Sequence, residues 1–237
     1  DMLMGMKVGG HKKAIIPSWL LSYKDYDSES KYLDQTTGLS TLVYDVRVKD
    51  FTTDINQWEI DSIGRFFSNG QVLIDGIAAD RIFVRNDGTV MTANDSVSKG
   101  FYYKQLVPPS SKEAFQSDTT IYINYTGRLL NGQVFDTTIE DVAKDHNIYS
   151  SSKSYAPVQI NWPNTKENEN HDKITMGTSE SSLVGGFTKT LWQMKAMEKG
   201  MGVFYSELGY TYTGSGQLIP AYSPLIFEIE IVENPNK

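Results

Sequence analysis

Apolar and polar residues alternate with a period of two in several short segments of this sequence, which is the pattern of strands buried on one face. Residues 120–125 place Ile121, Ile123 and Tyr125 on one face, and we expect that face to point into a core. Residues 101–106 are a further strand candidate. The same strict alternation recurs at residues 42–48 and 225–231. Together these segments predict an antiparallel sheet.

Two other segments repeat apolar residues at the spacing of a helix. Behind a Gly-Gly pair, a short helix with one buried face is predicted by three residues at i, i+4 and i+7, namely Phe187, Leu191 and Met194. Residues 55–67 carry a longer apolar stripe after Asp54, an expected N-cap, and an Asn-Gly pair ends the run. We interpret that stripe, which includes Trp58 and Phe66, as core rather than as a ligand site. One short helix packed on an antiparallel sheet indicates an α+β fold.

The chain also contains an internal repeat. The aligned segments are residues 6–16 with 194–204 and residues 42–48 with 225–231. Residues 1–51 are therefore interpreted as the C-terminal half of a domain whose complete copy spans residues 100–237. Because the half copy has no counterpart of residues 120–136, we expect upstream residues to complete it, the alternative being that it packs on the rest of the chain.

Residues 52–99 lie between the two copies and read as a connector with structure of its own. Its first part is the amphipathic helix described above. Further on, residues 81–85 and 89–92 flank an Asn-Asp-Gly turn, which is a sequence typical of a hairpin. The predicted connector is thus one helix followed by one hairpin.

Composition narrows the function classes. The formal charge of −7 without a basic stripe argues against a nucleic-acid partner. The sequence has no cysteine, which excludes disulfides, thiolate nucleophiles and zinc-thiolate sites. No apolar run approaches the ~20 residues of a membrane span. Three histidines, none in a triad or metalloprotease motif, argue against a conventional hydrolase. The polar loop with Glu167, Glu169, His171 and Asp172 is interpreted as solvated rather than as a cation site, so no metal or cofactor is expected.

An ordered set of residues in the second half carries the most specific signal, namely Tyr-Thr-Gly at 125–127, Gly132, Phe135, Asp136, Leu-Val-Gly-Gly-Phe at 183–187, Tyr210, Ile219, Pro220 and Leu-Ile-Phe at 225–227. In order and spacing this set resembles the FKBP-type peptidyl-prolyl isomerases. The resemblance extends over residues 120–232. It implies an FKBP-like antiparallel sheet wrapped around one short helix.

The resemblance also implies the site. It assigns catalytic roles to Asp136, Tyr210 and Phe227. It assigns substrate binding to Tyr125, Phe135, Leu183, Val184, Phe187 and Ile219. By resemblance, Phe187 lies at the pocket floor, where many members have Trp. The Val184 N–H and the Tyr210 hydroxyl would hold substrate carbonyls, and Asp136, oriented by Tyr125, would lie near the prolyl amide.

The expected activity is therefore peptidyl-prolyl cis/trans isomerisation of proline-containing peptides or unfolded protein segments, without a cofactor. A rival interpretation is a non-catalytic peptide-binding or chaperone module that uses the same apolar groove. A third is a structural surface protein that only reuses the fold, with the aromatic residues serving as core. The resemblance further implies binding of macrolide-type inhibitors. It suggests a bacterial cell envelope or periplasm, with the cytoplasm as the alternative.

Two departures from the family pattern stand out. The polar stretch at residues 139–176 is longer than usual, and we expect it to rim the pocket and shape the choice of partner, with Trp162 or Tyr155 supplying the aromatic residue of that edge. In the first half copy, Ser22 stands at the position of Tyr210 and Tyr44 at that of Phe227. That copy is therefore expected to have a compromised site.

Overall fold

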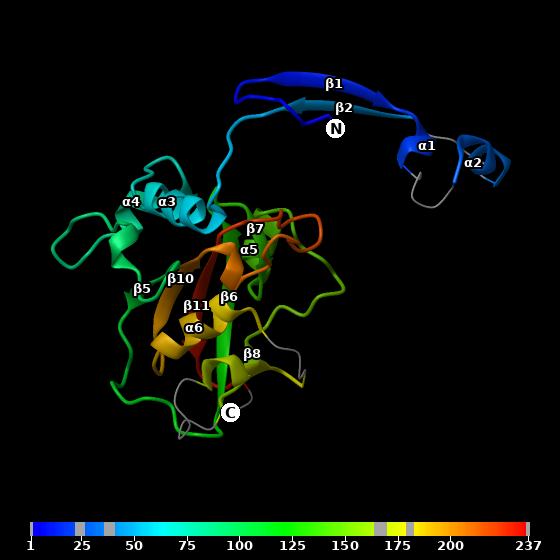
Figure 1. Ribbon diagram of the computed structural model, residues 1–237. Coiled ribbons are helices and arrows are strands. Elements are labelled where there is room, and N and C mark those ends of the chain that lie inside the picture. Colours follow the sequence, from blue (N-terminus) through cyan, green and yellow to red (C-terminus); the bar gives the residue numbers. More distant parts are fainter. Residues whose placement is uncertain (1, 22–26, 36–40, 164–169, 179–182, 236–237) are drawn as a thin grey trace. The chain divides into compact units, whose positions relative to one another are not determined.

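The computed structural model describes residues 2–21, 27–35, 41–163, 170–178 and 183–235. The chain divides into two compact units, Asp1–Thr53 and Asp54–Lys237. The first unit is a two-stranded antiparallel ribbon of β1 (His11–Ile16) and β2 (Leu42–Arg47), and the connection from β1 to β2 carries two short helices, α1 (Ser18–Leu21) and α2 (Glu29–Gln35), at one end of the ribbon (Figure 1). Ser22, the expected counterpart of Tyr210, lies outside the described residues.

The strand at residues 42–48 is antiparallel as predicted, but it is not half-buried. Leu42 and Tyr44, on the face predicted to be apolar and covered, are 42% and 40% exposed. On the opposite face, Val43 is 68% exposed. In the described part of this unit the ribbon is open on both faces, because two strands alone supply no third layer to cover an apolar face.

The second unit is built on a seven-stranded antiparallel sheet with the order β5-β10-β11-β6-β8-β9, and β7 pairs with β6 at the side. The strands are β5 (Phe101–Val107), β6 (Thr120–Leu129), β7 (Val134–Thr137), β8 (Val158–Asn161), β9 (Thr175–Met176), β10 (Lys199–Phe204) and β11 (Leu225–Val232). The helix α6 (Gly185–Gln193) lies across this sheet (Figure 1). Further short helices are α5 (Glu140–Asp145), η2 (Asn170–Lys173) and η3 (Ser206–Leu208). The predicted α+β fold is confirmed.

One face of the sheet forms a core with α6. Phe187 and Leu191 of the helix are 3% and 0% exposed, and they belong to the same cluster as Ile123 and Ile229 of the central strands. The helix approaches the sheet closely at Gly186, where an added Cβ would lie 2.2 Å from the Phe204 ring. Glycine is required there because any side chain would push the helix off the strands.

The other face is covered by the segment that was expected to be a connector. The predicted helix is confirmed as α3 (Ile55–Phe67), capped by Asp54, whose side chain accepts the Gln57 N–H at 3.0 Å. Ile63 and Phe67 of α3 are fully buried in one cluster with Tyr102 of β5, Val203 of β10 and Ile226 of β11. Neighbouring residues of β11, Leu225 and Phe227, belong to the α6 core. The sheet is therefore buried on both faces at this point.

Two details of that segment differ from expectation. Trp58 is 38% exposed, so its assignment to the core was wrong, whereas Phe66 is 4% exposed and does belong to the core. The hairpin is reduced to a single bridge between Val84 and Val90, because the residues before it end a helical turn, α4 (Ala79–Ile82). A short ribbon of β3 (Leu73–Ile74) and β4 (Ile77–Ala78) precedes α4.

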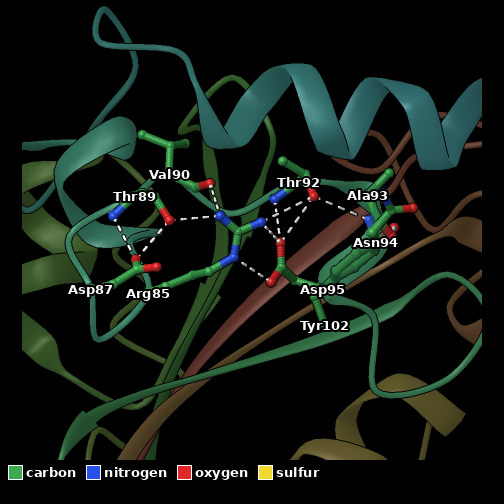
Figure 2. Close-up of polar contacts among 9 residues, drawn as sticks. All are labelled: Arg85, Asp87, Thr89, Val90, Thr92, Ala93, Asn94, Asp95 and Tyr102. Carbon is green, nitrogen blue, oxygen red and sulfur yellow. Dashed lines mark hydrogen bonds and ion pairs between the residues drawn. The ribbon is translucent and has the colours of Figure 1, made fainter.

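Arg85 organises the loop around that bridge. Its guanidinium group contacts both carboxylate oxygens of Asp95 at 2.7 Å and donates to Thr89 Oγ1 at 2.7 Å and to the Val90 carbonyl at 3.0 Å (Figure 2). Asp95 also closes a capping box with Thr92 at the start of η1 (Ala93–Asp95). A polar network therefore fixes this loop, where the sequence indicated a regular hairpin.

Candidate active site

A single cavity of about 460 Å³ gathers all nine residues assigned to the site by resemblance. It is lined by the first turn of α6, by residues of β6, β7, β9 and β11, and by the loop that follows η3. Five further residues line it that the sequence analysis did not name, namely Met176, Ser215, Gly216, Gln217 and Leu218. The last four directly precede Ile219, so the loop before the Ile-Pro pair was the available signal.

Aromatic rings meet edge to face in the wall of this cavity. Phe227 of β11 lies 5.0 Å from Phe187 and 5.5 Å from Phe135, with interplanar angles of 84° and 78°. Tyr125 of β6 lies 5.5 Å from Phe187 at 83°. Such arrangements place the positive edge of one ring on the negative face of another. The result is a fixed apolar cage with Phe187 and Phe227 almost fully buried.

The close packing of these rings depends on a glycine in β6. A Cβ at Gly127 would lie 2.4 Å from Phe135 Cε2 and 3.0 Å from Phe227 Cε1. The register between β6 and β7 shifts next to Gly127, which is a bulge that redirects side chains at this edge. The Tyr-Thr-Gly motif therefore places the phenol of Tyr125 and leaves room for the two rings.

Asp136 of β7 is the carboxylate of the cavity wall, and three groups hold it. The Tyr125 hydroxyl donates to Oδ2 at 2.6 Å, and the Thr137 N–H donates to Oδ1 at 2.9 Å. Lys153 forms an ion pair with the same carboxylate. Burial, with the negative charge of Asp136, raises the pKa of Tyr125, and burial followed by that charge raises the pKa of Tyr210. Both phenols therefore keep their protons at neutral pH and act as hydrogen-bond donors.

Val184 and Tyr210 border the cavity from two different loops. Val184 is the N-cap of α6, and its carbonyl accepts the N–H groups of Phe187 and Thr188 at 3.0 and 3.2 Å. Its own N–H has no acceptor within the described residues. Tyr210 follows η3 in a loop closed by hydrogen bonds from Thr211 N–H to the Ser206 carbonyl and from Tyr222 N–H to the Thr211 carbonyl, at 2.9 and 2.8 Å.

That loop is anchored from the other face of the sheet. Glu59 of α3 is fully buried, and its two carboxylate oxygens accept the N–H and the hydroxyl of Ser206 at 2.6 and 2.7 Å. Asn56 of the same helix donates to Glu207 at 2.8 Å. The helix α3 thus fixes the start of the loop that carries Tyr210, a link that no motif in the sequence indicated.

The aromatic residues proposed for the rim lie elsewhere. Trp162 is 6% exposed and stacks on Trp192, with centroids 5.3 Å apart, inside the α6 core. Tyr155 stacks on Tyr149 at 5.4 Å, and neither ring lines the cavity. Met176 of β9 occupies that edge instead. The assignment of Trp162 or Tyr155 was wrong because both rings are held by aromatic partners of their own.

The residues that the structure describes include no group of three or more His, Cys, Asp or Glu side chains able to hold a metal ion. Glu167 and Glu169, from the loop interpreted as solvated, lie outside the described residues. None of the described helices is both long and apolar enough to cross a membrane.

Comparison with known proteins agrees with the geometry. The family model for FKBP-type peptidyl-prolyl cis-trans isomerases matches residues 111–232. A probable FKBP-type isomerase of Haemophilus influenzae is 27% identical over 141 residues, which cover 59% of this chain and 45% of the relative. The macrophage infectivity potentiator of Trypanosoma cruzi is 25% identical over 133 residues, covering 56% and 52%. The chain thus spans about half the length of these relatives.

Among solved structures, FkpA from Escherichia coli aligns with a TM-score of 0.43 and 19% identity, covering 75% of this chain and 58% of that one. The family model alone covers residues 111–232, which is more than half of the sequence and includes all nine cavity residues named above. On that match, the chain belongs to the FKBP-type peptidyl-prolyl cis-trans isomerase family.

Proposed function

We propose that this chain catalyses cis/trans isomerisation of Xaa-Pro bonds in unfolded or exported protein segments. The observation that carries the proposal is the convergence of nine motif residues, from three strands, the start of α6 and the loop after η3, on one apolar cavity with a single carboxylate that is held by hydrogen bonds. The cavity is large enough for a proline ring and its neighbours, at about 460 Å³.

An apolar cage is suited to this reaction because of the electronic structure of the amide. Rotation about the bond removes its resonance against a barrier of ~18–20 kcal/mol, and the planar amide is more dipolar than the twisted one. A site that excludes water and binds the twisted form better than the planar form lowers that barrier. Phe135, Phe187 and Phe227 supply the cage in this proposal. No covalent intermediate is needed.

The polar groups around the cage orient the substrate. The Val184 N–H and the Tyr210 hydroxyl are proposed to donate to substrate carbonyls on either side of the proline. Asp136, held by Tyr125, is proposed to lie near the carbonyl of the twisting amide. The loss of one such hydrogen bond costs about 1–3 kcal/mol, which corresponds to a loss of roughly 5- to 150-fold in rate.

The test compares turnover with binding in the full chain. Isomerisation of an Xaa-Pro peptide is measured by NMR exchange for wild type, Asp136→Ala and Phe227→Leu, together with the Kd of the same peptide and a thermal melt. We expect Asp136→Ala to lower turnover by at least tenfold while the peptide still binds, and Phe227→Leu to weaken both. Peptide binding without wild-type turnover would refute the enzyme and leave a binding or chaperone module. If the wild type shows neither peptide binding nor turnover, only a structural role remains.

A further inference from the structure

The segment that follows β7 folds into a compact loop held by its own contacts. The rings of Tyr149 and Tyr155 stack 5.4 Å apart at an angle of 14°, and the Tyr155 hydroxyl accepts the Ser150 N–H at 3.0 Å. Lys144 of α5 lies 5.3 Å from the centroid of Tyr149 and pairs with Glu140 at 2.6 Å. Stacked rings with a cation on one face form a stable arrangement. The loop therefore has a defined structure that its own contacts stabilise.

A second lysine of this loop pairs with the carboxylate of the cavity wall. Lys153 lies 5.7 Å from the centroid of Tyr155, on the same aromatic pair, and forms an ion pair with Asp136. Its side chain is 35% exposed and that of Asp136 is 42% exposed. The pair therefore lies at the mouth of the cavity, where a substrate side chain next to the proline can approach both charges.

Lys153 determines the charge at that mouth. Among the described residues that line the cavity, Asp136 is the one carboxylate, and none is a lysine, arginine or histidine. Tyr125 and Tyr210 stay neutral because their pKa values are raised. With Lys153 in place the charge of the Asp136–Lys153 pair sums to zero. Without Lys153 it would be −1, and the mouth would repel acidic side chains and attract basic ones.

We propose that Lys153 is a specificity-determining residue, which lets the cavity accept Xaa-Pro segments with an acidic residue next to the proline. The inference rests on the proposed function, because it names a substrate preference of the same site. A unit charge ~8 Å away at an effective dielectric constant of ~40 changes the affinity of another charge about fivefold. Loss of the Lys153 charge weakens binding of an acidic substrate and strengthens binding of a basic one, so the two effects multiply in the ratio of the two affinities. Because salt screens both effects, we expect a change of about tenfold in that ratio.

The experiment measures kcat/KM for three peptides that differ only in the residue before proline, which is Glu, Leu or Lys. Lys153→Met removes the cation beside Asp136. Lys144→Met is the matched control. It also removes a lysine that lies over one ring of the stacked tyrosine pair, but Lys144 forms its ion pair with Glu140 and not with Asp136. Lys153→Arg tests whether a different side chain with the same charge keeps the wild-type preference. A thermal melt checks that each variant is folded.

Lys153→Met is expected to raise the ratio of the Lys peptide to the Glu peptide about tenfold at ~0.15 M salt, an effect that 1 M NaCl suppresses. The control should keep the wild-type ratio, and Lys153→Arg should restore it. Equal ratios for Lys153→Met and Lys144→Met would overturn the inference while leaving the isomerase intact. If wild type turns over none of the peptides, the proposed function fails, and the ratio of Kd values for the same peptides then decides the inference. Lys153→Gln replaces Lys153→Met if the latter is unfolded.

Discussion

The link between α3 and the Tyr210 loop can be tested by replacing one buried carboxylate. Glu59 accepts both polar hydrogens of Ser206, at 2.6 and 2.7 Å, and is completely buried. Glu59→Met keeps a side chain of similar volume but removes both acceptors. Ser206 is itself 3% exposed, so water cannot easily replace them. We expect the variant to unfold more readily and the loop to lose its anchor.

The magnitude follows from the two lost hydrogen bonds. A buried donor left without a partner costs about 1–3 kcal/mol, so two donors cost roughly 2–6 kcal/mol. Removing a buried carboxylate returns part of its desolvation cost, which leaves a net loss of about 2–4 kcal/mol. For a unit of this size each kcal/mol lowers Tm by ~2–4 °C, and a decrease of roughly 5–15 °C is expected.

Glu59→Gln separates the hydrogen bonds from the charge. Its amide oxygen can accept the Ser206 N–H and its amide nitrogen can donate to the Ser206 hydroxyl, so we expect a loss below ~1 kcal/mol. Burial raises the pKa of Glu59, against the opposing effect of its bonds to Ser206. A raised carboxyl pKa means that ionisation disfavours the folded state, a cost that is absent below the unfolded pKa and complete above the folded one. Relative to wild type, the glutamine variant should therefore gain stability as pH rises through that interval.

The measurement is urea unfolding of the three proteins from pH 4 to pH 7, followed by circular dichroism, with isomerase activity read in parallel. Glu207→Met serves as the control, because Glu207 is the exposed neighbour that accepts a hydrogen bond from Asn56 on the same helix. Surface changes of this kind usually stay within ~0.5 kcal/mol. The reasoning fails if Glu59→Met is no less stable than Glu207→Met, or if Glu59→Gln is as damaged as Glu59→Met.

Two further predictions concern the rings and the Arg85 loop. Gly127→Ala should cost about 1–3 kcal/mol and lower turnover at least tenfold, because its Cβ would lie 2.4 Å from the Phe135 ring; Gly64→Ala, whose Cβ has only ordinary contacts at 3.5 Å, is the control in the same melt and activity assays. The hydrogen bonds from Arg85 hold the pKa of Asp95 at about 2. Asp95→Asn should therefore destabilise the fold at pH 7, and the difference from wild type should shrink as pH falls from 4 toward 2, as measured by urea unfolding. A difference that is constant with pH would show that the ion pair contributes nothing.

Much of the sheet and the cavity follows from sequence pattern. The alternation at residues 120–125 correctly places Ile121 and Ile123 in the core, and the i, i+4, i+7 series correctly gives α6. Both patterns record which side of an element faces apolar neighbours, and that is decided locally. The order of the family motif also identified nine residues that line one cavity, although the sequence gives no distances between them.

The remaining features depend on contacts between distant segments. Ile226 lies on the face of β11 opposite to Leu225 and Phe227, and the sequence pattern predicts that this second face is polar and exposed. In the structure, however, Ile226 is completely buried in the cluster that α3 forms on that face. Lys153 lies in a polar stretch of lysines and serines, where no spacing indicates that it reaches Asp136. A sequence pattern indicates the environment of a single strand or helix, whereas contacts between distant residues form only when the folded segments pack against one another.

The burial of the sheet on its α3 side has a practical consequence for dissecting this protein. A fragment cut at residue 100, where the motif-bearing part begins, would leave Tyr102, Val203 and Ile226 facing water, although all three are now at most 1% exposed. Such a bare sheet face invites self-association in place of folding. The shortest fragment fit for expression and enzymology therefore starts at Asp54, and α3 should be treated as part of the unit that holds the candidate site.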